Sequence, residues 1–375
     1  LNQLSLAECR LVVTPLQDVP PTLAATLFVP ALKQVFFRAE QSARDTAATA
    51  ADYDKLALAF EHFGDLEFAT KARLAQTLDL LNRQDLDAAK IIVPRMQALA
   101  ERSGRADLAI AAGLRELRLA SLTRQFDGID DKVKILKARL GSVDARSVLH
   151  GNVFHQQANL LMEQDKLPEA IEAQTKAVAL LEADNPFGSS TLIAMARLAN
   201  YKQRARAPDA LAAAQQVYEY AIEVEGPYSE TTLTAASDYI TMLRHASEFT
   251  RALELAEVLV AARRLWNDQF ALAKSLQHRA AVHMQLEQPA KSFPDLQEAL
   301  QLVDREFGAN DIRTQTFVHN LGYALIPHEP KRAVQLLARA HQLTLSKYPA
   351  DHSRAIMGLI VLGMAQRDSN DLVAA

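Results

Sequence analysis

A block of about fifteen residues recurs along the second half of this sequence at a spacing of 41 residues. The segments NPFGSSTLIAMARLA at 185–199 and GPYSETTLTAASDYI at 226–240 align without a gap, with a proline, an aromatic residue and a Thr-Leu pair at matching places. The six copies end at Ala158, Ala199, Ile240, Ala281, Gly322 and Gly363, and all of these residues except Ile240 are small. A fixed period of this length is the signature of a repeat architecture, in which each unit packs on its neighbours.

Each copy predicts two helices, a first one that contains the small residue and a second one that follows a short connector. Residues four and one before the small position, and three after it, lie on one helical face with it and are mostly apolar. The second helix carries its own small or apolar anchor at Ala170, Ala210, Ala252, Ser292, Ala333 and Ala375. A glycine inside a helix costs about 1 kcal/mol relative to alanine. We therefore expect Gly322 to be present because it lets the second helix approach closely.

The repeat weakens towards the N-terminus. Residues 65–104 and 105–140 are each consistent with one more helix pair, and residues 50–63 with one more helix. The sequence thus predicts three regions: an N-terminal helical cap or the end of a preceding domain over 1–48, degenerate helix pairs over 49–143, and regular 41-residue repeats over 144–375, the last of them incomplete.

The repeats resemble tetratricopeptide (TPR) repeats. The resemblance rests on Leu321-Gly322 followed by Ala333 and on Ala158 followed by Glu169-Ala170. The longer period and the segments FGAND and HNLG are similar to the repeats of kinesin light chain. The resemblance implies an all-α, right-handed superhelical solenoid of about seven to eight antiparallel helix pairs, with the first helix of each pair lining a concave surface.

A mostly polar stripe lies beside the apolar face of each first helix, and the resemblance makes it the surface that contacts a partner. Amide side chains can pair with a peptide backbone, and guanidinium groups can bind a carboxylate through two hydrogen bonds. Gln285 belongs to the stripe. The peptide-binding candidates in this groove are His155, Asn159, Asn200, Gln203, Ser237, Thr241, Arg244, His278, Arg279, His319, Asn320 and Tyr323.

Composition and motifs argue against several other functions. A formal net charge of −4 provides no basic surface for nucleic acid or for anionic membranes. The single cysteine, Cys9, excludes an intramolecular disulfide framework and favours the cytoplasm. No P-loop, dinucleotide fingerprint, nucleophile elbow or HExxH motif is present, so we expect no enzyme activity, no cofactor and no metal.

Two functional hypotheses remain. The first is a protein- or peptide-binding scaffold or sensory module within a larger bacterial signalling protein. The start at Leu1 and the end at DLVAA, which would expose Leu359, Leu362 and Leu372, suggest a covalent neighbouring domain beyond either terminus. The alternative is a peptide-sensing effector, similar to quorum-sensing phosphatases and receptors, whose N-terminal helices act on a partner through Gln34, Glu40 or Gln41.

Overall fold

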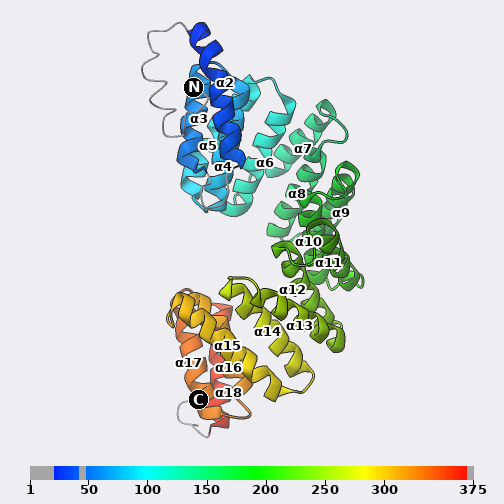
Figure 1. Ribbon diagram of the computed structural model, residues 1–375, viewed down its shortest axis with the longest axis vertical. Coiled ribbons are helices and arrows are strands. Elements are labelled where there is room, and N and C mark those ends of the chain that lie inside the picture. Colours follow the sequence, from blue (N-terminus) through cyan, green and yellow to red (C-terminus); the bar gives the residue numbers. More distant parts are fainter. Residues whose placement is uncertain (1–20, 42–47, 370–375) are drawn as a thin grey trace. The chain divides into compact units, whose positions relative to one another are not determined.

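The regular structure of this chain is helical. A computed structural model describes residues 21–41 and 48–369, and within these ranges it contains seventeen α-helices, α2 to α18, and no strand (Figure 1). The all-α prediction is confirmed. None of the helices in the described ranges combines the length and the apolar character that crossing a bilayer requires.

The chain divides into two compact units, Leu1–Tyr201 and Lys202–Ala375. The helices that begin in the first unit are α2 (Pro21–Gln41), α3 (Ala50–His62), α4 (Leu66–Asn82), α5 (Leu86–Arg102), α6 (Ala106–Thr123), α7 (Ile129–Arg139), α8 (Val148–Glu163), α9 (Leu167–Asp184) and α10 (Ser189–Arg204). Those of the second unit are α11 (Ala210–Glu225), α12 (Glu230–His245), α13 (Phe249–Arg264), α14 (Gln269–Gln285), α15 (Pro289–Phe307), α16 (Gln315–Leu325), α17 (Pro330–Leu345) and α18 (Ser353–Asp368).

Successive helices pack in pairs, and we call the even-numbered helices from α4 onward A helices and the odd-numbered ones from α5 onward B helices. The small position of the repeat lies at the A–B contact: a Cβ atom added to Gly322 would lie 2.9 Å from Cγ of Leu337 on α17. At Gly151 on α8, seven residues before the small position Ala158, the added atom would lie 2.3 Å from Cγ of Leu181 on α9. The predicted reason for the glycine, close approach of the second helix, is confirmed.

The turns between A and B helices share a backbone conformation that the sequence does not reveal. A residue other than glycine has a positive φ in six of these turns, at Gln84, Arg124, Asp165, Arg206, Ser247 and Glu287. This left-handed conformation reverses the chain within a few residues, and it is uncommon for residues with a side chain. Because the same turn occurs at Gln84 and Arg124, the regular A–B geometry extends into the region that the sequence predicts to be degenerate.

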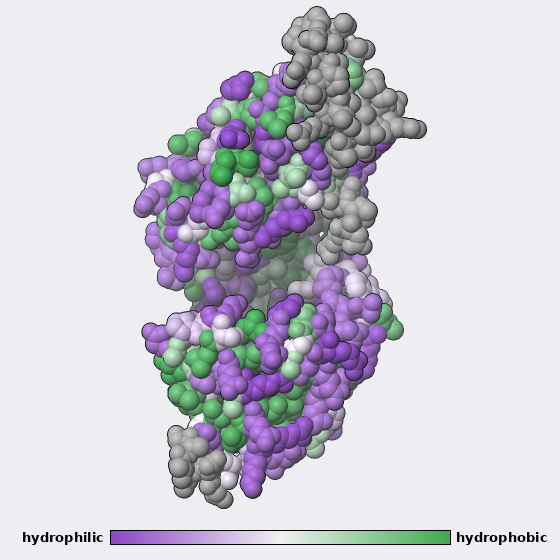
Figure 2. All heavy atoms as spheres, turned by 90° about the vertical axis from the view of Figure 1, so that its left-hand side faces the viewer, coloured by the Kyte–Doolittle hydropathy of each residue, from purple (hydrophilic) through white to green (hydrophobic). Residues whose placement is uncertain are grey.

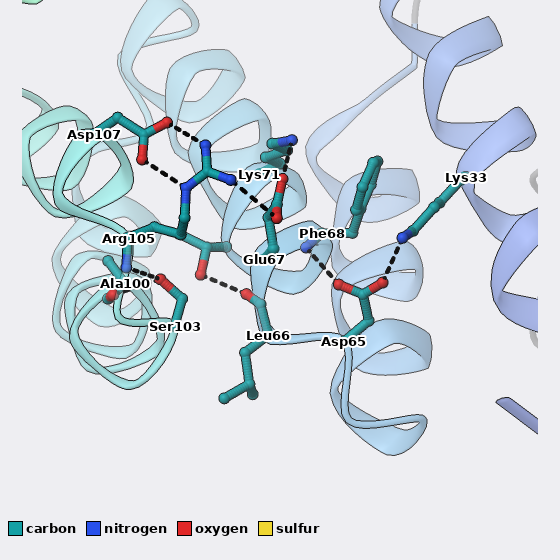
Figure 3. A network of polar contacts seen from close by, with 11 residues as sticks. Lys33, Asp65, Leu66, Glu67, Phe68, Lys71, Ala100, Ser103, Arg105 and Asp107 are labelled. Atoms are coloured by element: carbon teal, nitrogen blue, oxygen red, sulfur yellow. Dashed lines mark hydrogen bonds and ion pairs between the residues drawn. The ribbon is translucent and has the colours of Figure 1, made fainter. Parts of the chain in front are cut away.

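The N-terminal helix α2 packs into the same core as α3 and α4. The Phe36 ring meets the Phe68 ring edge-on at 5.8 Å, and Leu32 and Val35 are buried beside it. Lys33 Nζ contacts Asp65 at 2.8 Å and lies over the Phe68 ring (Figure 3). Whether α2 acts as a cap or ends a preceding domain stays a prediction.

The same network links the start of α4 to the start of α6. Glu67 pairs with Lys71 at 2.6 Å and with Arg105 at 3.3 Å, and Arg105 pairs with Asp107 at 2.8 Å (Figure 3). Exposed pairs of this kind contribute about 0–1 kcal/mol each. The apolar core therefore contributes most of the stability of this end of the chain.

The last helix, α18, has one buried and one exposed apolar side. Leu359 is 57% exposed, as expected, whereas Leu362 is only 8% exposed. The prediction that Leu362 is exposed is wrong because Leu362 belongs to the core that α17 and α18 share; Leu372 lies outside the described residues. Hydrophobic residues gather on the surface beside the C-terminal end of the chain (Figure 2).

Candidate binding site

A pocket in the second unit lies across three consecutive A helices, α12, α14 and α16. Its volume is about 430 Å³. Four of the sequence-predicted groove residues line it together: Arg244, His278, Asn320 and Tyr323. The repeat explains why these four residues lie together. Each is a few residues from the small position of its own helix, Ile240, Ala281 or Gly322, and such residues recur on the same side of successive A helices.

Arg244 supplies a cation that has no carboxylate partner in the described part of the chain. Its Nε donates to Oε1 of Gln285, which occupies the same repeat position one A helix later, at 2.7 Å. Burial lowers the pKa of Arg244, yet a guanidinium stays charged at any physiological pH. None of the ion pairs found among residues 21–41 and 48–369 involves it. The group therefore keeps hydrogen-bonding capacity for a ligand.

Lys274 and His278, both on α14, line the pocket beside Arg244 of α12. The Lys274 ammonium lies 4.3 Å from the centre of the Phe270 ring. Burial, together with the positive charges of Arg244 and Lys274, lowers the pKa of His278 from 6.5 to about 4. His278 is therefore neutral near pH 7 and offers one donor and one acceptor. Among the described lining residues there is no aspartate or glutamate, so the pocket is electropositive.

The remaining lining residues supply an apolar floor and a further donor. Met284 and Leu296 contribute apolar surface, together with alanines of α14 and α16. Nε2 of Gln277 is buried and has no hydrogen-bond partner within the described part of the chain. The pocket thus combines positive charge, amide groups and an apolar base, which suits a peptide residue with an acidic group.

Arg279 pairs with a residue of the neighbouring helix. The sequence places it in the groove, but its Nε and Nη2 donate to the two carboxylate oxygens of Asp295 on α15, at 2.8 and 2.7 Å. Asp295 is only 5% exposed. Arg279 therefore joins an A helix to its B helix and does not line the pocket.

Other predicted residues of the second unit lie outside this pocket. The hydroxyls of Ser237 and Thr241 donate to carbonyls of their own helix, to Leu233 at 3.0 Å and to Ser237 at 3.1 Å. The His319 ring is stacked on that of Tyr323, with centroids 6.5 Å apart. Gln203 is half-buried near the end of α10.

The predicted residues of the first unit mostly make contacts between helices. Nδ1 of His155 lies 3.0 Å from Nε2 of the fully buried Gln174, and burial lowers the pKa of His155 to about 4. Asn159 accepts a hydrogen bond from the Tyr201 hydroxyl at 2.8 Å. Asn200 is exposed. His155 and Asn159 thus tie successive helices together.

The sequence reasoning missed Lys274, Gln277 and the apolar floor. Lys274 lies seven residues, two helical turns, before Ala281. The polar stripe was defined too close to the small position to include it, and extending the same face by one turn would have found it. No three His, Cys, Asp or Glu side chains in the described ranges are grouped as a metal site.

Comparisons with known proteins rest on structure alone. No protein-family model and no curated protein matches the sequence. The apo form of RapI is 13% identical with a TM-score of 0.64, covering 80% of this chain and 84% of its own. NprR in complex with its cognate peptide NprX is also 13% identical, with a TM-score of 0.50, and the match covers 80% of this chain and 85% of that one.

A third match is the STAND protein with a tetratricopeptide repeat sensor from Pyrococcus horikoshii. It is 14% identical with a TM-score of 0.64, and the match covers 94% of this chain and 51% of the other. This chain thus spans about half the length of that protein. At such identities the likeness concerns the fold: the chain has the all-α helical-repeat architecture of TPR-like proteins, as the sequence predicts.

Proposed function

We propose that this chain is a recognition module that binds a peptide segment across α12, α14 and α16 and thereby regulates or scaffolds a larger signalling assembly. The observation that carries the proposal is the electropositive pocket in which Arg244 and Lys274 meet no carboxylate of the described residues. In this proposal an acidic side chain or the terminal carboxylate of the peptide contacts the two cations.

The other lining groups have separate roles. The amides of Gln277 and Asn320 pair with the peptide backbone, since an amide offers both donors and an acceptor. Met284 and Leu296 receive an apolar side chain of the peptide. The helices preform this surface, so most of the ordering cost of binding falls on the peptide.

The fold comparisons support a regulatory role without specifying it. NprR binds its cognate peptide NprX, and the archaeal STAND protein carries its repeats as a sensor. The proposal extends the same kind of role to this chain, with the covalent neighbour or partner supplying the output.

A peptide-display selection on the full chain tests the proposal. Selected peptides should be enriched in acidic residues or in free C-terminal carboxylates, and their affinity should fall at about 0.5 M salt, because salt screens exposed charges. The double variant Arg244→Met with Lys274→Met should weaken binding by about tenfold or more, the worth of a charge-assisted hydrogen bond.

The matched control is Arg264→Met, which removes a cation that pairs with Glu298 at 2.7 Å on the B helices. This control should leave the affinity unchanged. Selected peptides that bind the double variant as tightly as the wild type would refute the proposed site.

A further inference from the structure

A second pocket, of about 390 Å³, lies in the first unit. It is bounded by the end of α2, by α3, by one face of α4 and by α6. Arg115 comes from α6, and Glu40 comes from α2. Gln34, Glu40 and Gln41 are all exposed, and of these three effector candidates only Glu40 lines the pocket. This pocket has no part in the proposed peptide site, which lies in the other unit.

Arg115 is the unusual group in this pocket. Its Nε is buried without a hydrogen-bond partner, and none of its nitrogens forms an ion pair within the described ranges. Burial, followed by the nearby charge of Arg118, lowers its pKa, and the charge of Glu40 opposes that effect. Arg115 is half-buried, and a buried N–H without a partner is costly, so this arrangement calls for a physical explanation.

Two other arginines of this chain show how a guanidinium with a buried Nε is paired with carboxylates. Nε of Arg73 and of Arg263 is also buried without a partner. The terminal nitrogens of Arg73 pair with Asp54 and Glu61, and those of Arg263 pair with Glu230. Arg115 has no such carboxylate among the residues whose placement the structure gives, and it lines a cavity instead.

Three other polar groups that line this pocket already have partners. Lys71 pairs with Glu67 at 2.6 Å. The two oxygens of Asp79 accept from the backbone N–H of Ala50 and from Nε of Arg83, each at 2.8 Å. Asn82 accepts from Arg118 at 2.8 Å.

Glu40 is the anionic counterpart of Arg115. Its Oε1 accepts from the Tyr53 hydroxyl at 2.9 Å, and it forms no ion pair among the residues that the structure describes. Tyr53 is buried, and its pKa is raised first by that burial and then by its hydrogen bond to Glu40. The hydroxyl therefore stays protonated and holds the carboxylate at the pocket.

We infer that this pocket binds a small zwitterion, a free amino acid or a dipeptide, with its carboxylate on Arg115 and its ammonium on Glu40. The two charges are opposite, both line one cavity, and neither forms a salt bridge with any residue in the ranges 21–41 and 48–369. The volume suffices for a ligand of this size. Binding gives the Arg115 guanidinium an anionic partner that the described part of the chain does not supply.

Isothermal titration calorimetry on the full chain tests this inference. The probes are the common L-amino acids and a set of glycyl dipeptides, with acetate and ethylamine as ligands that carry one charge each. At least one zwitterion should bind with a Kd of about 1 mM or tighter, and acetate and ethylamine should bind at least about tenfold more weakly.

Variants then locate the binding. Arg115→Met should weaken the zwitterion by about tenfold or more, and Glu40→Gln should weaken it while leaving its N-acetyl derivative unaffected. The control Arg139→Met, which removes a cation that pairs with Glu101 at 2.6 Å and has no part in this cavity, should leave binding intact. Circular dichroism checks folding, and Glu40→Gln, at an exposed helix end, keeps the test decisive if Arg115→Met does not fold.

Three results overturn the inference: no zwitterion binds the wild type, acetate binds as tightly as the best zwitterion, or a folded Arg115→Met binds as the wild type does. None of these bears on the peptide pocket of the other unit. A failure here is therefore distinct from a failure of the proposed function.

Discussion

Replacing Gly322 and Gly363 by alanine compares two glycines at the same repeat position in different surroundings. A Cβ at Gly322 would lie 2.9 Å from Cγ of Leu337 and 3.2 Å from Cβ of Leu336, whereas at Gly363 it would meet nothing within 4 Å among residues 21–41 and 48–369. Alanine gains about 1 kcal/mol of helix propensity at either place. Of the two positions, only Gly322 has a described B helix that alanine would force outward.

The expected magnitudes follow from these contacts. Overpacking a tight contact costs about 1–3 kcal/mol, so Gly322→Ala should lower the free energy of unfolding by about 1 kcal/mol after the propensity gain. Gly363→Ala should raise it by about 0.5–1 kcal/mol. The two substitutions should therefore differ by about 2 kcal/mol and in sign.

Urea unfolding followed by circular dichroism measures both changes, and hydrogen exchange in α16 and α18 assigns them to the helices concerned. Leu337→Ala removes the side chain that the new methyl group meets. In that background Gly322→Ala should become less destabilising, with a coupling of about 1 kcal/mol. If Gly322→Ala stabilises the wild-type chain as much as Gly363→Ala does, close approach is not the role of the glycine.

Three further outcomes are expected. Arg279→Met should lower the free energy of unfolding in urea by about 2 kcal/mol, since it leaves the buried Asp295 carboxylate unpaired, but should not change peptide affinity; a tenfold affinity loss would return Arg279 to the site. By NMR, the His278 ring should titrate near pH 4; because its folded pKa lies below the ordinary 6.5, the unfolded chain takes up the proton first, and stability falls as the pH drops from 6.5 towards 4. A midpoint above 6 would contradict the burial of His278 among cations. Finally, Phe36→Ala should cost about 3–4 kcal/mol and Lys33→Met less than about 1 kcal/mol, because the α2 contact is mainly apolar; equal losses in urea unfolding would contradict this.

The repeat architecture was predictable because it depends on a period, and a period is visible in one dimension. The small residues at Ala158, Gly322 and their equivalents mark where helices touch, and steric contact alone requires them there. The turns were not predictable. Gln84, Arg124 and Glu287 adopt the left-handed conformation without being glycine, so their residue types carry no signal.

Only the part of the candidate site that lies on the A helices could be predicted, because those helices carry the small position that repeats every 41 residues. The period places Arg244, His278, Asn320 and Tyr323 on the same side of successive helices, and the structure brings them into one pocket; that they bind a peptide stays a prediction. The pairing of Arg279 was not predictable because its partner, Asp295, belongs to a different helix whose orientation the periodicity of α14 does not contain. Leu296 was missed for the same reason.

The most direct test of the central claim is a crystal structure of the full chain bound to a peptide selected on it. The account predicts that a carboxylate of the peptide lies within hydrogen-bond distance of Arg244 or Lys274, with an apolar side chain against Met284 and Leu296. A peptide bound elsewhere, with the pocket across α12, α14 and α16 unoccupied, would contradict it.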